Sequence, residues 1–210
     1  MTRSVQFLKT SFDEQADKAE AFVNLLEDNK NEFADGTSVI TQYAVEISYE
    51  LAYLRLFGAW ESFLEEVFVR YLCGYSRGLD LQEPLLAGQT YSTTLSAAEA
   101  RLLSGRSYVS WYVPSEIVSR CRRFFSGGNF EYVVSSASQI LEDQRCTRHQ
   151  IAHVQKHATR NFDNMTTRLV GKRFPGSSAG RFLRSQRPGG GRWLFHFSIQ
   201  LRGLASQLTT

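Results

Sequence analysis

The spacing of apolar residues predicts helices along most of this chain. Apolar side chains recur every three or four residues between positions 4 and 33, which is the period of a helix with one buried face. The pair Asp35-Gly36 predicts the end of this helix, because glycine readily adopts the left-handed conformation of a C-terminal cap. Thr37 or Ser38 is expected to cap the helix that follows.

A longer second helix is predicted from about Val39 to Cys73, a stretch without proline in which only Gly58 weakens the helix. Its apolar residues are too many for a single stripe, so several neighbours must pack around it, and we expect it to be the central helix. These residues are Tyr43, Ile47, Leu51, Leu54, Phe57, Trp60, Leu64, Val67, Phe68 and Tyr71.

The rest of the chain predicts shorter helices separated by turns. Residues 74–94 contain proline and glycine and are expected to form a loop, after which Ser96 and Glu99 predict a capping box. Pro114 opens a further helix that ends near Gly127. Three more helices are expected over Tyr132–His157, Asn161–Val170 and Arg192–Gln207. No run with the period of a strand is convincing.

These elements predict an all-α helical bundle with one core, a long central helix and a C-terminal helical extension. We expect a single domain over residues 1–210. It would comprise the N-terminal helix (1–36), a core (37–160) and an arginine-rich C-terminal segment (161–210).

The charge of the chain is small overall but unevenly distributed. The formal net charge is +3, yet residues 160–210 hold nine basic residues and only Asp163 as an acidic one. Arginine binds phosphate through a rigid fork of N–H donors, and a patch of one sign attracts polyanions. Two readings stay open. The segment either forms a nucleic-acid footprint or balances the acidic N-terminal helix.

Several classes of protein are not expected. No apolar run approaches the roughly 18 residues of a membrane span, and residues 1–18 lack the apolar core of a signal peptide. The three cysteines (Cys73, Cys121 and Cys146) form no CxxC pair, so we expect a reduced, cytoplasmic protein. The motifs of P-loop nucleotide binding, zinc proteases, EF-hands and serine hydrolases do not occur.

The most informative cluster is a set of histidines. His149, His153 and His157 are spaced i, i+4 and i+8 on one predicted helix, and Arg145 and Arg148 precede them. This pattern has three interpretations: a polar face without function, a zinc site, or acid–base chemistry on a phosphodiester. The zinc interpretation is the weaker one, because Cys146 lies away from the His149/His153 stripe and no carboxylate is near.

The segment Arg148-His149-Gln150-Ile151-Ala152-His153 resembles the Arg-polar-(x)3-His signature of HEPN superfamily ribonucleases. Residues 54–66, around Trp60-Glu61, are similar to the central helix of the RiboL-PSP-HEPN branch, as is the stretch from Phe174 to Leu183. The resemblance covers roughly residues 40–205. Two positions depart from family patterns: Val154 replaces a frequent glycine, and Gln155 replaces the tyrosine typical of members paired with a nucleotidyltransferase antitoxin.

The resemblance implies a dimeric, metal-independent endoribonuclease that needs no cofactor and serves as a toxin or antiviral effector. An antitoxin or defence-system protein would then be a further partner. By position, Arg148 and His153 are the catalytic pair, His149 is the polar residue after the arginine, and Glu61 supports the site. RNA contacts are expected from the basic residues Arg145, Lys156, Arg181 and Arg184.

Helix geometry adds a constraint on this site. On a straight helix, Arg148 and His153 diverge by about 140° and rise by about 7.5 Å, too far for both to hold one phosphate. We therefore expect a composite site at a homodimer interface. Two alternatives remain: a non-catalytic HEPN-like module that binds RNA, a nucleotide or a protein, and a histidine-ligated metal protein.

Overall fold

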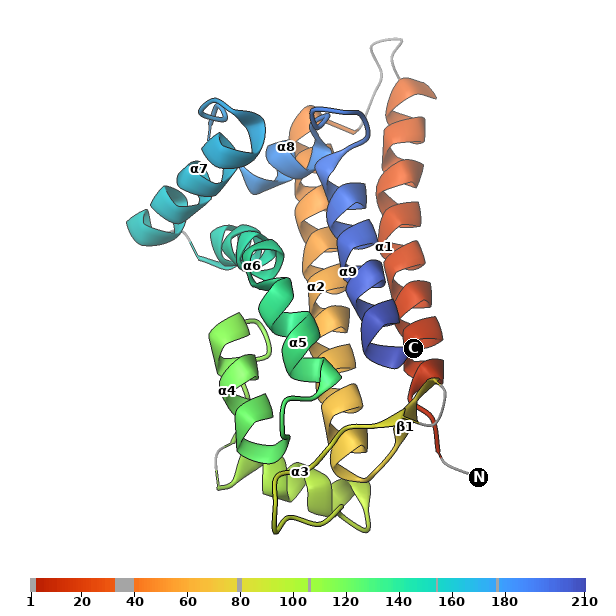
Figure 1. Cartoon of the computed structure of the whole chain (residues 1–210). Helices are drawn as coiled ribbons and strands as arrows, with labels where there is room; N and C mark the ends of the chain where they lie inside the picture. The colour runs from red at the N-terminus through yellow and green to blue at the C-terminus, as the bar shows by residue number, and fades with distance from the viewer. Residues whose placement is uncertain (1–2, 33–39, 79–80, 106, 154, 177) are drawn as a thin grey trace. The chain divides into compact units, whose positions relative to one another are not determined.

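The computed structural model describes residues 3–32, 40–78, 81–105, 107–153, 155–176 and 178–210. Within these ranges the chain forms nine α-helices and one two-stranded antiparallel sheet, which confirms the predicted all-α fold (Figure 1). The elements are α1 (Gln6–Glu32), α2 (Gln42–Leu72), β1 (Ser76–Arg77), β2 (Leu81–Gln82), α3 (Leu95–Leu103), α4 (Pro114–Phe124), α5 (Asn129–Ser136), α6 (Ser138–Ala152), α7 (Lys156–Val170), α8 (Ala179–Arg184) and α9 (Trp193–Thr209).

Hydrophobic periodicity predicted α1, α2, α4 and α9 to within a few residues. Proline is the first residue of α4, where its missing N–H is not needed. The hydroxyl of Thr41 accepts a hydrogen bond from the N–H of Ala44 at 3.2 Å, so Thr41 caps α2. The predicted caps at residues 35–38 lie outside the described residues.

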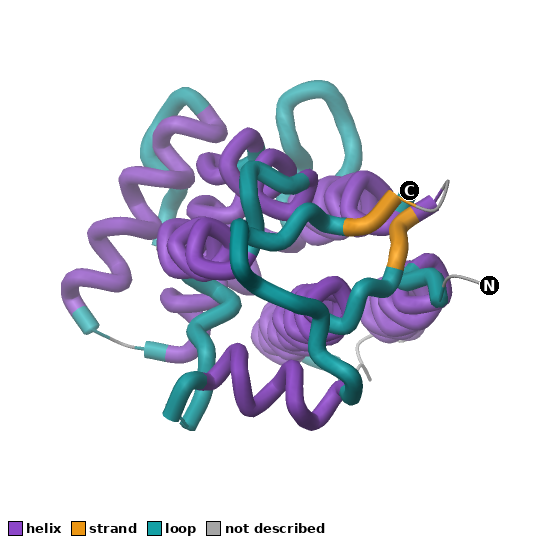
Figure 2. The backbone as a smooth tube through the Cα atoms, turned by 60° about the horizontal axis from the view of Figure 1, so that its bottom comes forward, coloured by secondary structure: helices purple, strands orange, loops and turns teal. Residues whose placement is uncertain are grey.

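Two local details differ from the prediction. Helix α3 is capped by Thr94 rather than by Ser96, because the Thr94 hydroxyl accepts the N–H of Ala97 at 3.1 Å. The expected loop between α2 and α3 contains β1 and β2, drawn in orange in Figure 2, which pair Ser76 with Gln82. Such two-residue strands are too short to produce a period in the sequence.

The predicted helix over 132–157 is wrong. The chain there forms α5, α6 and the first turn of α7, with Ala137 between α5 and α6 and residues 153–155 between α6 and α7. The sequence also gave no signal for α8, a helix of six residues that is capped by the Ser178 hydroxyl. Among the described residues, no helix combines the length and apolarity needed to cross a membrane.

The chain divides into two compact units, each built from separated segments. The first unit comprises residues 1–13, 60–142 and 201–210, and the second comprises 14–59 and 143–200. In the first unit the buried ring of Phe68 is the hub of the core. Four aromatic rings lie with their centroids 5.0–6.0 Å from it: Trp111, Phe124, Phe125 and Phe130.

The second unit has an aromatic hub of its own at Phe182 of α8. Its ring is fully buried, and the ring of Trp193 stacks on it with centroids 5.0 Å apart. Three further rings, those of Phe162, Phe174 and Phe197, lie 5.5–6.2 Å from it. Aromatic contacts of this kind contribute roughly 0.5–1.5 kcal/mol each beyond the area they bury.

A half-buried ionic cluster also holds the second unit together. The Glu27 carboxylate of α1 accepts hydrogen bonds from Arg184 of α8 at 2.6 and 3.2 Å, and Arg192 approaches it at 3.8 Å. Burial alone raises the pKa of Glu27, but the hydrogen bond and charge of Arg184, the charge of Arg192 and the hydrogen bond from Tyr49 together leave that pKa below its usual value. Burial raises the pKa of Tyr49 to about 12, so its hydroxyl stays protonated and donates to Glu27 at 3.2 Å.

Helix α8 approaches α2 closely within the second unit, and this approach requires glycine. The N–H of Gly180 donates to the Glu50 carboxylate of α2 at 2.9 Å. A Cβ atom at position 180 would lie 2.1 Å from the carbonyl oxygen of Glu46, a backbone atom that cannot swing aside. The side of α8 that carries Gly180 is therefore fixed against α2 by backbone contact.

We predict that Gly180→Ala destabilises the protein by about 1–3 kcal/mol, because the added methyl group forces α8 away from α2. The matched control is Gly58→Ala in α2, where no atom lies within 4 Å of the added Cβ. That substitution should stabilise the protein by about 0.5–1 kcal/mol, the ordinary gain of alanine over glycine in a helix. Urea unfolding of both variants measures the difference, and equal effects would contradict the close approach.

Candidate active site

The histidine end of the motif lies at a helix terminus rather than in mid-helix. Helix α6 ends at Ala152, and the N–H of His153 makes the last bond of the helix, to the carbonyl of His149 at 3.0 Å. His153 is exposed, and α7 begins three residues later at Lys156. The imidazole of His153 therefore projects from the turn that joins two helices.

Helices α6 and α7 pack against each other in opposite directions. Within the second unit, Asp143 of α6 forms an ion pair with Arg168, which lies near the end of α7. At the other end of the pair, Cys146 and His149 of α6 line a small pocket together with His157 and Asn161 of α7. The two helices thus form a helical hairpin, in which the chain reverses between Ala152 and Lys156.

This hairpin corrects the predicted histidine face. His157 does not share a helix with His149 and His153, because the helix breaks between them. The turn nevertheless returns His157 to the pocket that His149 lines. All three imidazoles consequently lie at the turn end of the α6–α7 hairpin.

The imidazole rings of His149 and His153 are neighbours. Their centroids are 4.5 Å apart and their planes are inclined by 52°. The spacing of four residues predicted this proximity, because residues i and i+4 lie on the same face of a helix. A positive charge on His153 therefore disfavours protonation of His149.

His149 has a perturbed pKa. Burial lowers the pKa of its half-buried imidazole below 6.5, and the positive charges of His153, Arg145, Arg148 and His157 lower it further. A lowered pKa favours the neutral ring, so at neutral pH His149 is an unprotonated imidazole among cations. Such a group is suited to accept a proton.

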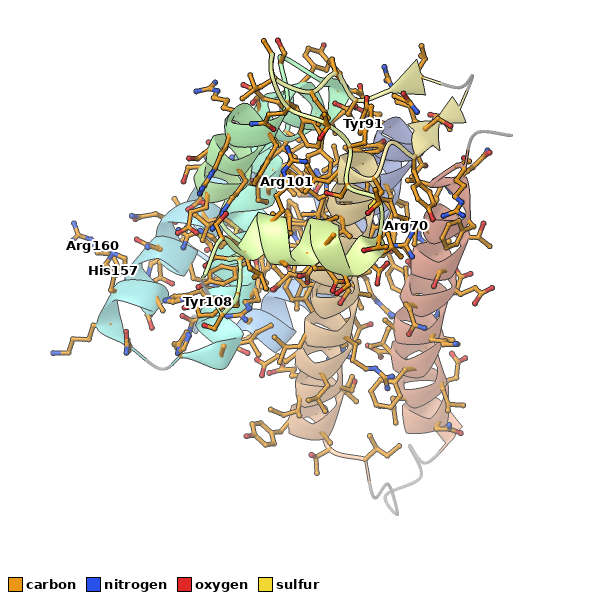
Figure 3. The ribbon with its side chains drawn as sticks, turned by 90° about the horizontal axis from the view of Figure 1, so that it is seen from below. Arg70, Tyr91, Arg101, Tyr108, His157 and Arg160 are labelled. Carbon is orange, nitrogen blue, oxygen red and sulfur yellow. The ribbon has the colours of Figure 1, made fainter. Side chains whose placement is uncertain are left out.

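His157 has its own partner on α7. The side-chain amide nitrogen of Asn161 lies 3.4 Å from its Nδ1 atom, and an amide that donates there leaves the proton of the neutral ring on Nε2. His157 is exposed and lies with Arg160 at the outer edge of α7 (Figure 3). The sequence analysis did not include Asn161 among the site residues. Its spacing of four residues from His157 nevertheless indicates that both lie on the same face of α7.

The other predicted catalytic residues have different surroundings. Arg148 is half-buried on α6, directly before His149, whose pKa its charge lowers. Glu61 is half-buried on α2 and belongs to the first unit, whereas Arg148, His149 and His153 belong to the second. The support that Glu61 is expected to give to the motif stays a prediction.

The four predicted RNA contacts divide into two kinds. Lys156 and Arg181 are exposed, and Arg145 is half-buried and lines the His149 pocket. Arg184 instead directs its guanidinium at Glu27, with only 21% of its side chain exposed. This engagement favours a structural role for Arg184 over a contact with RNA.

In the part of the chain that the structure describes, no three His, Cys, Asp or Glu side chains form a group that could hold a metal ion. Comparison with known proteins adds nothing to the resemblance of the motif. No protein-family model, no curated protein and no solved structure matches this chain.

Proposed function

We propose that this protein is a metal-independent endoribonuclease whose acid–base pair is His149 and His153. The observation that carries the proposal is the pair of imidazoles 4.5 Å apart, with the pKa of one of them lowered by burial and by surrounding cations. The resemblance of residues 148–153 to the HEPN signature supports the same reaction class. A role as a toxin or antiviral effector, with an antitoxin or defence-system partner, rests on that resemblance alone.

The proposed reaction uses only side chains of the motif. Neutral His149 takes the proton of a ribose 2′-OH, and the oxygen attacks the adjacent phosphorus. Arg148 stabilises the negative charge that develops on the phosphorane oxygens. The bond to the 5′-oxygen then breaks, and protonated His153 gives its proton to that leaving oxygen. The products are a 2′,3′-cyclic phosphate and a 5′-OH.

The division of roles follows from protonation. The lowered pKa of His149 favours the neutral form that a base requires. The sequence analysis paired His153 with Arg148 and expected a second chain to complete the site, because the two side chains diverge on a straight helix. Helix α6 ends at Ala152, but the N–H of His153 still bonds to the carbonyl of His149, so His153 continues the helical geometry and the divergence stands. The homodimer stays a prediction that rests on this geometry and on the family resemblance.

We predict that His149→Ala, His153→Ala and Arg148→Ala each lower the cleavage of single-stranded RNA by about 100-fold or more. The assay is run in excess EDTA, with mass spectrometry of the 3′ ends. His157→Ala is the control, because the proposed reaction does not use that imidazole, and it should keep most of the activity. Activity that requires added Mg²⁺ or Mn²⁺, or products that end in 3′-OH, would contradict the mechanism.

Mixing two inactive chains tests whether the site is complete within one chain. We predict that equimolar His149→Ala and His153→Ala chains stay inactive together, because the two rings that must cooperate belong to the same α6 segment. Light scattering of the same mixture reports whether the chains associate. Recovery of activity on mixing would show instead that each site takes its histidines from two chains.

The protonation of His149 is measurable without substrate. We predict an NMR titration midpoint for His149 below 6.5. Arg145→Gln removes a positive charge that disfavours the protonated ring, so it should raise that pKa towards 6.5. Arg181→Gln is the matched control, since Arg181 is not among the groups that shift His149. A wild-type midpoint at or above 6.5, or equal responses to the two variants, would overturn the assignment.

A further inference from the structure

An open pocket on α7 is lined by residues that are all polar or charged. It has a volume of about 470 Å³, which lies in the range of small-molecule sites, but those sites are mostly apolar. Here the lining is charged or capable of hydrogen bonding, and includes Lys156, Arg160, Arg173, Thr159, Asn164 and Asp163. This chemistry suits a hydrated anion rather than an apolar ligand.

Basic residues outnumber acidic ones among the described residues that line the pocket. Asp163 is the only acidic residue in its lining and lies 3.5 Å from Arg173, so it offsets part of one cation. Among the described residues, Lys156 and Arg160 have no ion-pair partner, and both are exposed. The first turn of α7 also contains no acidic residue. Helix dipoles favour negative charge at such a turn, so Lys156 adds to a potential that nothing in that turn cancels.

We infer that this pocket binds the phosphate backbone of a single-stranded nucleic acid. Arg160 and Lys156 would contact phosphate oxygens, while the hydroxyl and amide groups of Thr159 and Asn164 would add neutral hydrogen bonds. The lining contains no aromatic side chain on which a base could stack. The site therefore recognises backbone charge, and its binding tolerates changes of base sequence.

The position of the pocket relates it to the proposed active site in the same unit. Arg160 follows His157 by less than one turn of α7, and the two side chains lie together in Figure 3. A strand that reaches the histidine pocket, which His157 lines, could then continue past Arg160. That the strand is RNA rests on the proposed function, whereas the recognition of phosphates does not.

The test compares two charge reversals that are equal in size. Arg160→Glu changes a cation of the pocket, and Lys172→Glu changes an exposed cation just beyond the end of α7 that does not line it. Fluorescence anisotropy measures binding of an uncleavable 2′-O-methyl RNA oligonucleotide, with a DNA oligonucleotide of the same sequence in parallel. Arg160→Glu should weaken binding of both about tenfold and lower the salt slope by about 0.7 per lost phosphate contact. Lys172→Glu should change affinity less than about twofold.

The outcomes separate this inference from the proposed function. Equal weakening by the two variants would mean a general charge effect and would overturn the site, and so would wild-type affinity in Arg160→Glu. Binding of the RNA but not of the DNA would also overturn it, because the contacts would then not be to phosphate. Wild-type protein that binds both strands through Arg160 but cleaves no RNA would support the site and refute the nuclease. Both substitutions are at exposed positions, so melting temperatures should stay within the small range of surface changes.

Discussion

The ion pair between Asp143 and Arg168 is the contact on which the candidate site depends. The Asp143 side chain is only 10% exposed, and a carboxylate so deeply buried requires a partner. Its partner stands near the far end of α7, so the pair holds α6 and α7 in opposite directions. The Tyr53 hydroxyl donates to the carbonyl of Gln144 at 2.7 Å and fixes α6 against α2. With α6 so held, the reversal of the chain brings His157 of α7 to the pocket that His149 lines.

The break that makes this hairpin was predicted at residues 158–160, but α6 ends earlier, at Ala152. Residues 138–170 contain neither glycine nor proline, the usual signals of a helix end. The buried residues on both sides of the break, Leu141, Gln144, Thr147, Ala158 and Phe162, would also fall on one face of a continuous helix. The predicted helix therefore continued past Ala152 to His157, and the next helix was expected to begin at Asn161 rather than at Lys156. By contrast, α1, α2, α4 and α9 follow from local pattern.

The candidate site was predictable to the extent that it is local. The proximity of His149 to His153 follows from their helical spacing and requires no knowledge of tertiary structure. Asn161 joins the site only because α7 folds back onto α6. The pKa of His149 is lowered mainly by burial of its ring, and burial cannot be read from the sequence pattern. For the same reason the sequence does not distinguish Arg160 from Arg184. Arg160 is exposed, whereas Arg184 is paired with Glu27.

The structure supports one reading of the arginine-rich segment, in which its charge balances the acidic N-terminal helix. Arg184 and Arg192 meet Glu27 of the acidic N-terminal helix, as expected if the segment balances that helix. Arg168 and Arg173 meet Asp143 and Asp163. Three carboxylates offset part of the charge of these four arginines, which stabilises the fold and weakens the field outside it. A polyanion would be attracted mainly by exposed cations without an ion-pair partner, such as Arg160. The net charge of the segment is therefore larger than the charge available for binding.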